Sequence, residues 1–145
     1  MKEHEAVEIL LVEDSDADAE MIVRSLRKGN LVNQVFRVHD GVEALEFIFR
    51  QGEYRERRGG NPKLILLDVK MTRLGGIDVL RKLKSEESTK VIPIVMLTSS
   101  AEDRDIQESY HLGVNSYLVK PVNFSEFTNV VAQVGLYWAV MNRMP

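Results

Sequence analysis

Cysteine is absent from the 145 residues of this chain. Without cysteine there is no disulfide framework and no zinc site built from thiolates. The chain also lacks any apolar run near the roughly 20 residues of a membrane-spanning helix, and its charged start, MKEHEAVE, is unlike a secretory signal. We therefore expect a soluble, cytoplasmic protein that does not contact a membrane.

A strong charge of one sign is missing as well. The sequence holds 22 acidic and 19 basic residues, and its net charge is only -3. Such a balanced chain creates no long-range field that would attract nucleic acid or an anionic membrane. Its length and its hydrophobic content of 44% suit one ordinary core. We expect a single domain over residues 1–145 that recognises its partners through local contacts.

Short apolar runs alternate with segments of helical period along the chain. This alternation is typical of repeated strand-helix units, whose parallel strands form one sheet. With right-handed connections, the units predict an α/β protein with a doubly wound, five-stranded parallel sheet of flavodoxin-like order 2-1-3-4-5. The expected strands are 7–12, 34–38, 64–67, 94–97 and 116–119, and the last helix is expected over 123–141.

Several helix ends are predicted from residue type. Asp16 and Asn123 stand where N-caps belong, and Gly29 and Gly113 lie where helices should stop. The fourth helix, over 103–112, has only a weak apolar stripe. The residues expected to form the buried face of that helix are Ile106 and Tyr110.

Polar residues suited to phosphoryl chemistry follow four of the expected strands: Glu13 with Asp14, Asp68, Thr98 and Lys120. Parallel strands end at the same edge of a sheet, so we expect these side chains to lie together. Unit charges of like sign repel by roughly 4 kcal/mol at about 4 Å in a medium of intermediate dielectric. Mg²⁺, a hard cation with oxygen ligands, would offset this repulsion together with the lysine. Taken singly, each acidic residue would be an ordinary cap or turn residue, and only their convergence favours a site.

Four segments carry a resemblance to a known family. They are LLVEDS at 10–15, LILLDVKM at 64–71, VMLTSS at 95–100 and SYLVKP at 116–121. In order and spacing they resemble the receiver domain of two-component response regulators, over essentially the whole chain. The resemblance implies the receiver fold and a stand-alone phosphoacceptor signalling domain. Such a domain catalyses only its own phosphorylation and dephosphorylation, so it is not an ordinary enzyme.

The resemblance implies roles for the residues at the strand ends. Asp68 would accept a phosphoryl group from a sensor histidine kinase, and Lys120 would contact that group. Glu13, Asp14 and Asp68 would bind Mg²⁺, and the backbone carbonyl of Lys70 would complete the metal ligands. In physical terms, the cation and the ammonium reduce the repulsion between carboxylate and phosphate in the transition state.

The resemblance also implies a conformational switch. Thr98 and Tyr117 would form the switch pair, and the peptide bond before Pro121 would be cis. The acceptor oxygens of a phosphoryl group would give the Thr98 hydroxyl a new hydrogen bond, and the space it leaves would admit the Tyr117 ring. The surface around the fourth helix, fifth strand and fifth helix would then signal by protein contact or by phosphorelay to a histidine phosphotransfer protein. Outside this pattern, Tyr117 would be an ordinary aromatic residue of an edge strand.

Three positions depart from the family pattern. Thr72 stands where proline is usual, and Gly75 replaces an acidic or amide residue, so we expect a looser loop after the acceptor. Lys70 puts a long cation two residues after Asp68. We hypothesise that its side chain alters the lifetime of the acyl phosphate, and the alternative is a lysine that points into solvent.

Two regions bear on partners. The connection over 50–63 is long and basic, which suits a solvated loop or a docking surface. With the extended carboxyl end, it resembles stand-alone regulators that partner bacterial phytochromes. The final helix carries apolar residues outside its core stripe, and a helix that is apolar all round is buried on more than one side. We expect a symmetric homodimer through the fourth and fifth helices, with the last helix and tail over 123–145 in the interface, unless the tail folds back on its own domain. The residues expected at its interface are Leu136, Tyr137 and Val140.

Other functional classes fit less well. Haloacid-dehalogenase-type phosphatases also use an aspartate and Mg²⁺, but they normally carry a second aspartate where Lys70 stands. The sequence has no P-loop motif and no dinucleotide-binding glycine turn, which argues against a nucleotide site. A phosphorylation-independent, receiver-like interaction domain is the main alternative. Because the chain ends soon after the final helix, we expect no DNA-binding output domain.

Overall fold

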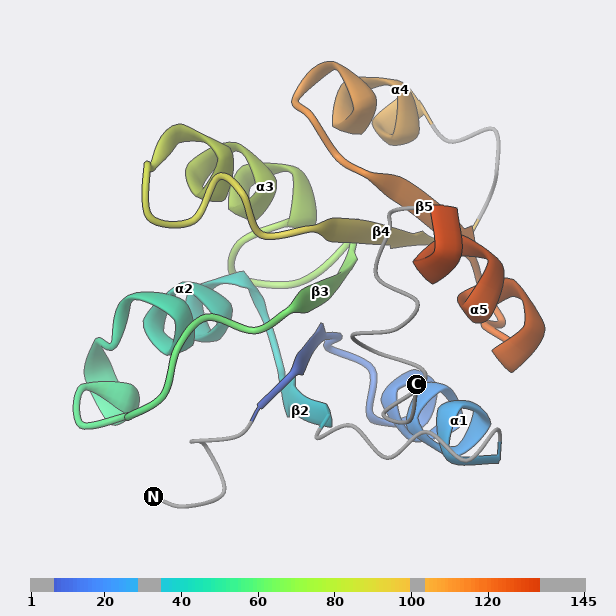
Figure 1. Ribbon diagram of the computed structural model, residues 1–145, viewed down its shortest axis with the longest axis horizontal. Coiled ribbons are helices and arrows are strands. Elements are labelled where there is room, and N and C mark those ends of the chain that lie inside the picture. The colour runs from blue at the N-terminus through green and yellow to red at the C-terminus, as the bar shows by residue number, and fades with distance from the viewer. Residues whose placement is uncertain (1–6, 29–34, 100–103, 134–145) are drawn as a thin grey trace.

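The computed structural model describes residues 7–28, 35–99 and 104–133, except for the side chains of 104–106. No helix in these ranges is long and apolar enough to cross a membrane. The elements in Figure 1 are, in chain order, β1 (Ile9–Val12), α1 (Asp16–Lys28), β2 (Val35–Val38), α2 (Gly41–Phe49), the short 3₁₀ turn η2 (Gly52–Tyr54), β3 (Leu64–Asp68), α3 (Gly76–Ser85), β4 (Ile94–Thr98), α4 (Arg104–His111), β5 (Ser116–Val119) and α5 (Phe124–Gln133).

The strands form one parallel sheet of five strands in the order β2-β1-β3-β4-β5, which confirms the predicted topology. β1 pairs with both β2 and β3, so the strand order reverses beside β1. Strand β3 reads LILLD and is buried along its whole length. Helices cover both faces of a parallel sheet, so neither row of its side chains meets water.

Two helical layers cover the sheet, with α1 and α5 on one face and α2, α3 and α4 on the other (Figure 1). Alternate residues of each strand belong to opposite layers. In β1, Ile9 and Leu11 pack with α1 and α5, whereas Leu10 and Val12 pack with the other helices. The same alternation continues past the strand ends and decides on which face each polar side chain emerges.

The start of α1 differs from the prediction. The N-cap is Ser15, whose Oγ accepts a hydrogen bond of 3.1 Å from the backbone N–H of Asp18. Asp16 is instead the first helical residue, and its carboxylate accepts a hydrogen bond of 2.8 Å from Arg37. The prediction of Asp16 as the cap was wrong by one residue, because a serine hydroxyl satisfies the free N–H groups of a first turn equally well.

Two other helix ends were predicted correctly. Asn123 caps α5, since its Oδ1 accepts a hydrogen bond of 2.8 Å from the backbone N–H of Glu126. Gly113 follows α4 with a φ of 99°, a left-handed conformation that side chains other than glycine rarely adopt. The stop expected at Gly29, the helical stretch expected beyond 133 and the interface residues Leu136, Tyr137 and Val140 lie outside the described residues.

Helix α4 presents a different face to the core than expected. Tyr110 was predicted to be buried, but it is 47% exposed, whereas Ser109 is only 1% exposed. Ser109 and Tyr110 are adjacent in the helix and point about 100° apart, so the rotation that buries Ser109 leaves Tyr110 at the side of the helix. A weakly apolar helix on the outer strands gives no pattern from which this rotation could be read.

The connection after α2 is packed rather than solvated. Tyr54 and Arg57 are only 6% and 5% exposed. The hydroxyl of Tyr54 donates a hydrogen bond of 2.6 Å to Glu43. The guanidinium of Arg57 lies 4.2 Å from the centre of the Phe47 ring and donates a hydrogen bond of 2.8 Å to the Phe47 carbonyl. The expectation of a solvated loop was therefore wrong for these two residues, because an arginine with a buried stem packs like an apolar side chain.

Candidate functional site

The alternation of side chains places two acidic residues on the same side of the sheet edge. Glu13 continues the row of Ile9 and Leu11 that faces α1, and Asp68 ends β3 in the corresponding row. Both are buried, with exposures of 0% and 5%. Two carboxylates in such a position need a cation nearby, because an unpaired buried charge is costly.

Lys120 supplies a positive charge at this place. It follows β5, and its Nζ lies 2.7 Å from Oε1 of Glu13 and 3.2 Å from Oδ2 of Asp68. A third carboxylate, that of Asp18 at the start of α1, lies 3.1 Å from the same nitrogen. The structure thus brings together Glu13, Asp68 and Lys120, as expected from the strand order, and adds Asp18. The bond between Lys120 and Pro121 is cis, also as expected.

The position of Asp18 was missed by sequence reasoning. It lies in the first turn of α1, four residues after Asp14, and α1 begins at the edge of the sheet where the strands end. That spacing was a signal in the sequence. It was not decisive, because acidic residues are common in the first turn of any helix.

The acidic residues form a group that suits a divalent cation. One carboxylate oxygen from each of Glu13, Asp14 and Asp68 lies within 4.8 Å of the others. Oε1 of Glu13 is fully buried and receives no hydrogen bond of good geometry, although Nζ of Lys120 is close. This buried oxygen has no well-oriented hydrogen-bond donor among the described residues and lies beside two more carboxylates. Such a group of oxygen ligands is the environment that Mg²⁺ or Mn²⁺ prefers.

The charges in this group shift the pKa values of its members. Burial and the neighbouring Glu13 raise the pKa of Asp68 to about 7, against the opposing effect of Lys120. Burial alone would lower the pKa of Lys120, but contacts with Glu13, Asp68 and Asp18 raise it above the usual lysine value. Lys120 is therefore charged at neutral pH, and one ammonium does not fully compensate the carboxylates around it.

The loop between β3 and α3 closes one side of the group. Oδ2 of Asp14 accepts a hydrogen bond of 3.2 Å from the backbone N–H of Thr72. Arg73, with a φ of 63°, donates hydrogen bonds of 2.8 and 3.2 Å to the carboxylate of Asp40 at the start of α2. This tether to α2 was not foreseen. It holds the loop at the point where the sequence lacks the proline usual at position 72.

Thr98 and Tyr117 lie on the face of the sheet covered by α3 and α4, and only Thr98 of the two lines the acidic cavity. Thr98 ends β4 and is only 1% exposed. The half-buried ring of Tyr117 contacts Tyr110 of α4 edge-on, with 6.1 Å between the ring centres. A cavity of about 200 Å³ at the sheet edge is lined by Glu13, Asp14, Ser15, Asp18, Asp68, Val69, Lys70, Thr98, Ser99 and Lys120.

The sequence profile of the response regulator receiver domain matches residues 9–132. The chain is 35% identical to the response regulator Rcp1 of Synechocystis over 137 residues, which are 94% of this chain and 92% of Rcp1. The Mn²⁺-bound structure of Rcp1 superposes with a TM-score of 0.73 at 35% identity and covers 94% of this chain and 97% of that one.

Two further solved structures are similar. The bacteriophytochrome response regulator RtBRR superposes with a TM-score of 0.85 at 46% identity and covers 94% of this chain and 82% of its own. The phosphorylated cyanobacterial phytochrome response regulator RcpA superposes with a TM-score of 0.73 at 34% identity, covering 94% of this chain and 95% of its own. This chain therefore belongs to the response regulator receiver domain family, whose members are phosphoacceptor signalling domains and not classical enzymes.

Proposed function

We propose that the protein is a stand-alone response regulator, one receiver domain over its 145 residues, that accepts a phosphoryl group on Asp68 from a sensor histidine kinase. The observation that carries this proposal is the placement of a nearly buried carboxylate 3.2 Å from the Lys120 ammonium, within an acidic group that suits a divalent cation. The negative charge of a carboxylate in this position would be screened by the ammonium on one side and by a bound cation on the other. Attack of a carboxylate on a phosphoryl group needs such screening.

The transfer proceeds by displacement at phosphorus. An oxygen of the Asp68 carboxylate forms a bond to phosphorus while the bond to the imidazole nitrogen of the donor breaks, and that nitrogen keeps the electron pair. Lys120 neutralises charge on the phosphoryl oxygens as they approach. Glu13, Asp14, Asp68 and the carbonyl of Lys70 would hold Mg²⁺, which lowers the repulsion between the two anions when it is bound.

The response to phosphorylation involves Thr98 and Tyr117. The phosphoryl group offers acceptor oxygens at the cavity that Thr98 lines, so the hydroxyl moves toward it and donates a hydrogen bond. Tyr117 then takes up the space that is left, and its edge-on contact with Tyr110 is broken. Because Tyr110 is 47% exposed, the surface formed by α4, β5 and α5 changes where a partner can contact it.

The names of the similar proteins suggest the input signal. RtBRR and RcpA are phytochrome response regulators. We infer that the cognate kinase is a bacterial phytochrome or a related light sensor, and that the signal passes to a protein partner or a histidine phosphotransfer protein.

The test is phosphorylation with a small donor. The protein is incubated with acetyl phosphate and Mg²⁺, and its intact mass is measured alongside that of Asp68→Asn. The wild type is expected to gain the mass of one phosphoryl group, and the variant none, because an amide is not nucleophilic toward phosphorus. Asp18→Asn is the matched control and should still be labelled. A wild type that never gains the group would favour the phosphorylation-independent interaction domain instead.

We also propose a symmetric homodimer formed by the end of the chain. Its basis is the apolar character of Leu136, Tyr137 and Val140 in the sequence beyond α5. Sedimentation at micromolar concentration is expected to give a dimer for the wild type and a monomer for Tyr137→Glu. Val91→Glu is the control. Val91 is 76% exposed on the folded domain, and this variant should leave the dimer intact. A wild type that sediments only as monomer, with and without phosphorylation, contradicts the proposal.

A further inference from the structure

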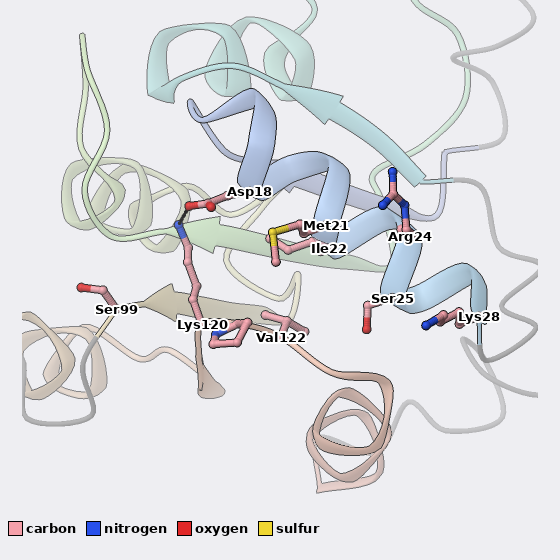
Figure 2. A pocket seen from close by; sticks show the side chains of 10 residues that line it. Asp18, Met21, Ile22, Arg24, Ser25, Lys28, Ser99, Lys120 and Val122 are labelled. Atoms are coloured by element: carbon pink, nitrogen blue, oxygen red, sulfur yellow. Dashed lines mark hydrogen bonds and ion pairs between the residues drawn. The ribbon is translucent and has the colours of Figure 1, made fainter.

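Asp18 contacts the site lysine but does not belong to the metal-binding carboxylates. Its Oδ2 lies 3.1 Å from Nζ of Lys120, and the two side chains point toward each other in Figure 2. The Asp18 side chain is 42% exposed, whereas that of Glu13, which also contacts Lys120, is fully buried. Of the carboxylates that contact Lys120, that of Asp18 can therefore separate from the ammonium at the lowest cost in free energy, because water readily hydrates it.

In this state the ammonium of Lys120 donates hydrogen bonds to Asp18 and Asp68 and also lies close to Glu13. An ammonium has three N–H donors. Its nitrogen lies within 3.2 Å of three carboxylates, those of Glu13, Asp18 and Asp68. A phosphoryl group on Asp68 adds oxygens that compete for the same donors, and its charge is repelled by the Asp18 carboxylate.

The surroundings leave room for Asp18 to withdraw. Asp18, Ser99 and Lys120 line both the acidic cavity of about 200 Å³ and a second cavity of about 700 Å³. The second cavity lies between α1 and the segment after β5, and Met21, Ile22 and Val122 also line it (Figure 2). The pair of Asp18 and Lys120 thus stands between the two cavities. Rotation of the Asp18 side chain toward the larger cavity would separate the pair without moving the backbone.

We propose that Asp18 is a positioning residue that holds Lys120 back from the phosphoryl group and thereby slows phosphoryl transfer to and from Asp68. The inference rests on the proposed function. In the forward step the Asp68 oxygen bonds to phosphorus and the acetate oxygen of acetyl phosphate leaves. In dephosphorylation a water oxygen bonds to phosphorus, the Asp68 carboxylate leaves, inorganic phosphate is released and a proton passes to solvent. Both steps place negative charge on phosphoryl oxygens beside Lys120, so Asp18 slows both.

The decisive variant is Asp18→Asn, which keeps the size of the side chain and removes its charge. With saturating Mg²⁺, we expect both the rate of labelling by acetyl phosphate and the rate of loss after donor removal to rise about threefold to fivefold, the upper part of the range for a partly exposed ion pair. Asp18→Glu keeps the charge and should stay close to the wild type. High salt should narrow the difference between Asp18→Asn and the wild type, because screening weakens the charge effect.

Asp16→Asn is the matched control. Asp16 lies in the same turn of α1 and carries the same charge, but its side chain is 88% exposed and pairs with Arg37. This variant should change both rates by less than about twofold. Rates of Asp18→Asn equal to those of the wild type, or equal increases in both asparagine variants, would overturn the inference while leaving the function of Asp68 intact. A wild type that is not labelled at all would overturn the proposed function and this inference together.

Discussion

Lys120→Met is expected to destabilise the protein by about 3 kcal/mol in the presence of a metal chelator and to slow labelling by acetyl phosphate about a hundredfold. The stability effect follows from burial. Lys120 is the cation between Glu13 and Asp68, which are almost fully buried, and its removal leaves their charges unpaired. The rate effect has a different origin, since in the proposed reaction the ammonium also neutralises charge on the phosphoryl oxygens in the transition state.

The two effects of Lys120→Met separate when Mg²⁺ is added. A cation bound by Glu13, Asp14 and Asp68 compensates the carboxylates, so urea unfolding should show that most of the lost stability returns. Labelling should remain slow, because the second positive charge is still missing. Lys63→Met is the control, since Lys63 pairs with Glu8 at the surface and should cost at most about 1 kcal/mol. An equal loss of stability with and without Mg²⁺ would contradict the charge argument.

Gly76→Ala is expected to destabilise the protein by about 3 kcal/mol and to weaken labelling of Asp68. Gly76 begins α3 directly against the end of β3, where Asp68 lies. A Cβ atom at this position would lie 2.2 Å from the carbonyl oxygen of Asp68 and 3.0 Å from its carbonyl carbon. Both atoms belong to the backbone of a central strand, which cannot yield as the tip of a side chain can, so Asp68 itself must shift.

The neighbouring glycine offers a sharp comparison for this prediction. At Gly75 an added Cβ would lie 3.6 Å from the carbonyl oxygen of Val69, an ordinary contact distance. Gly75→Ala should therefore keep both the urea midpoint and the labelling rate near those of the wild type. If the two alanine variants were equally stable, the close approach of α3 to β3 would not be the cause.

Much of the site could be predicted because it depends on the order of residues within strands. The apolar runs predict which strands are central, and alternation along each strand decides which polar residue emerges on which face. Glu13 and Asp68 therefore meet at one edge of the sheet, as expected from the sequence, and the structure shows that they do so on the side of α1. Family motifs added the expected roles of these residues, which the labelling experiment tests.

The parts that could not be predicted depend on how helices and loops are placed. The buried face of α4 was assigned to Tyr110, but the helix turns Ser109 inward. The packing of Arg57 on Phe47 and the tether from Arg73 to Asp40 join segments that no periodic pattern connects. In each case a polar residue has several possible partners, and only the packed structure selects one.

The sequence by itself determined the parallel sheet, its strand order and the gathering of carboxylates at one edge, because apolar periodicity is a local property that strand alternation turns into geometry. Only the tertiary structure decided that Asp18 reaches Lys120, a residue 102 positions away. That contact depends on where the first turn of α1 lies against the end of β5, and this placement is set by the packing of α1 and α5 on their shared face of the sheet.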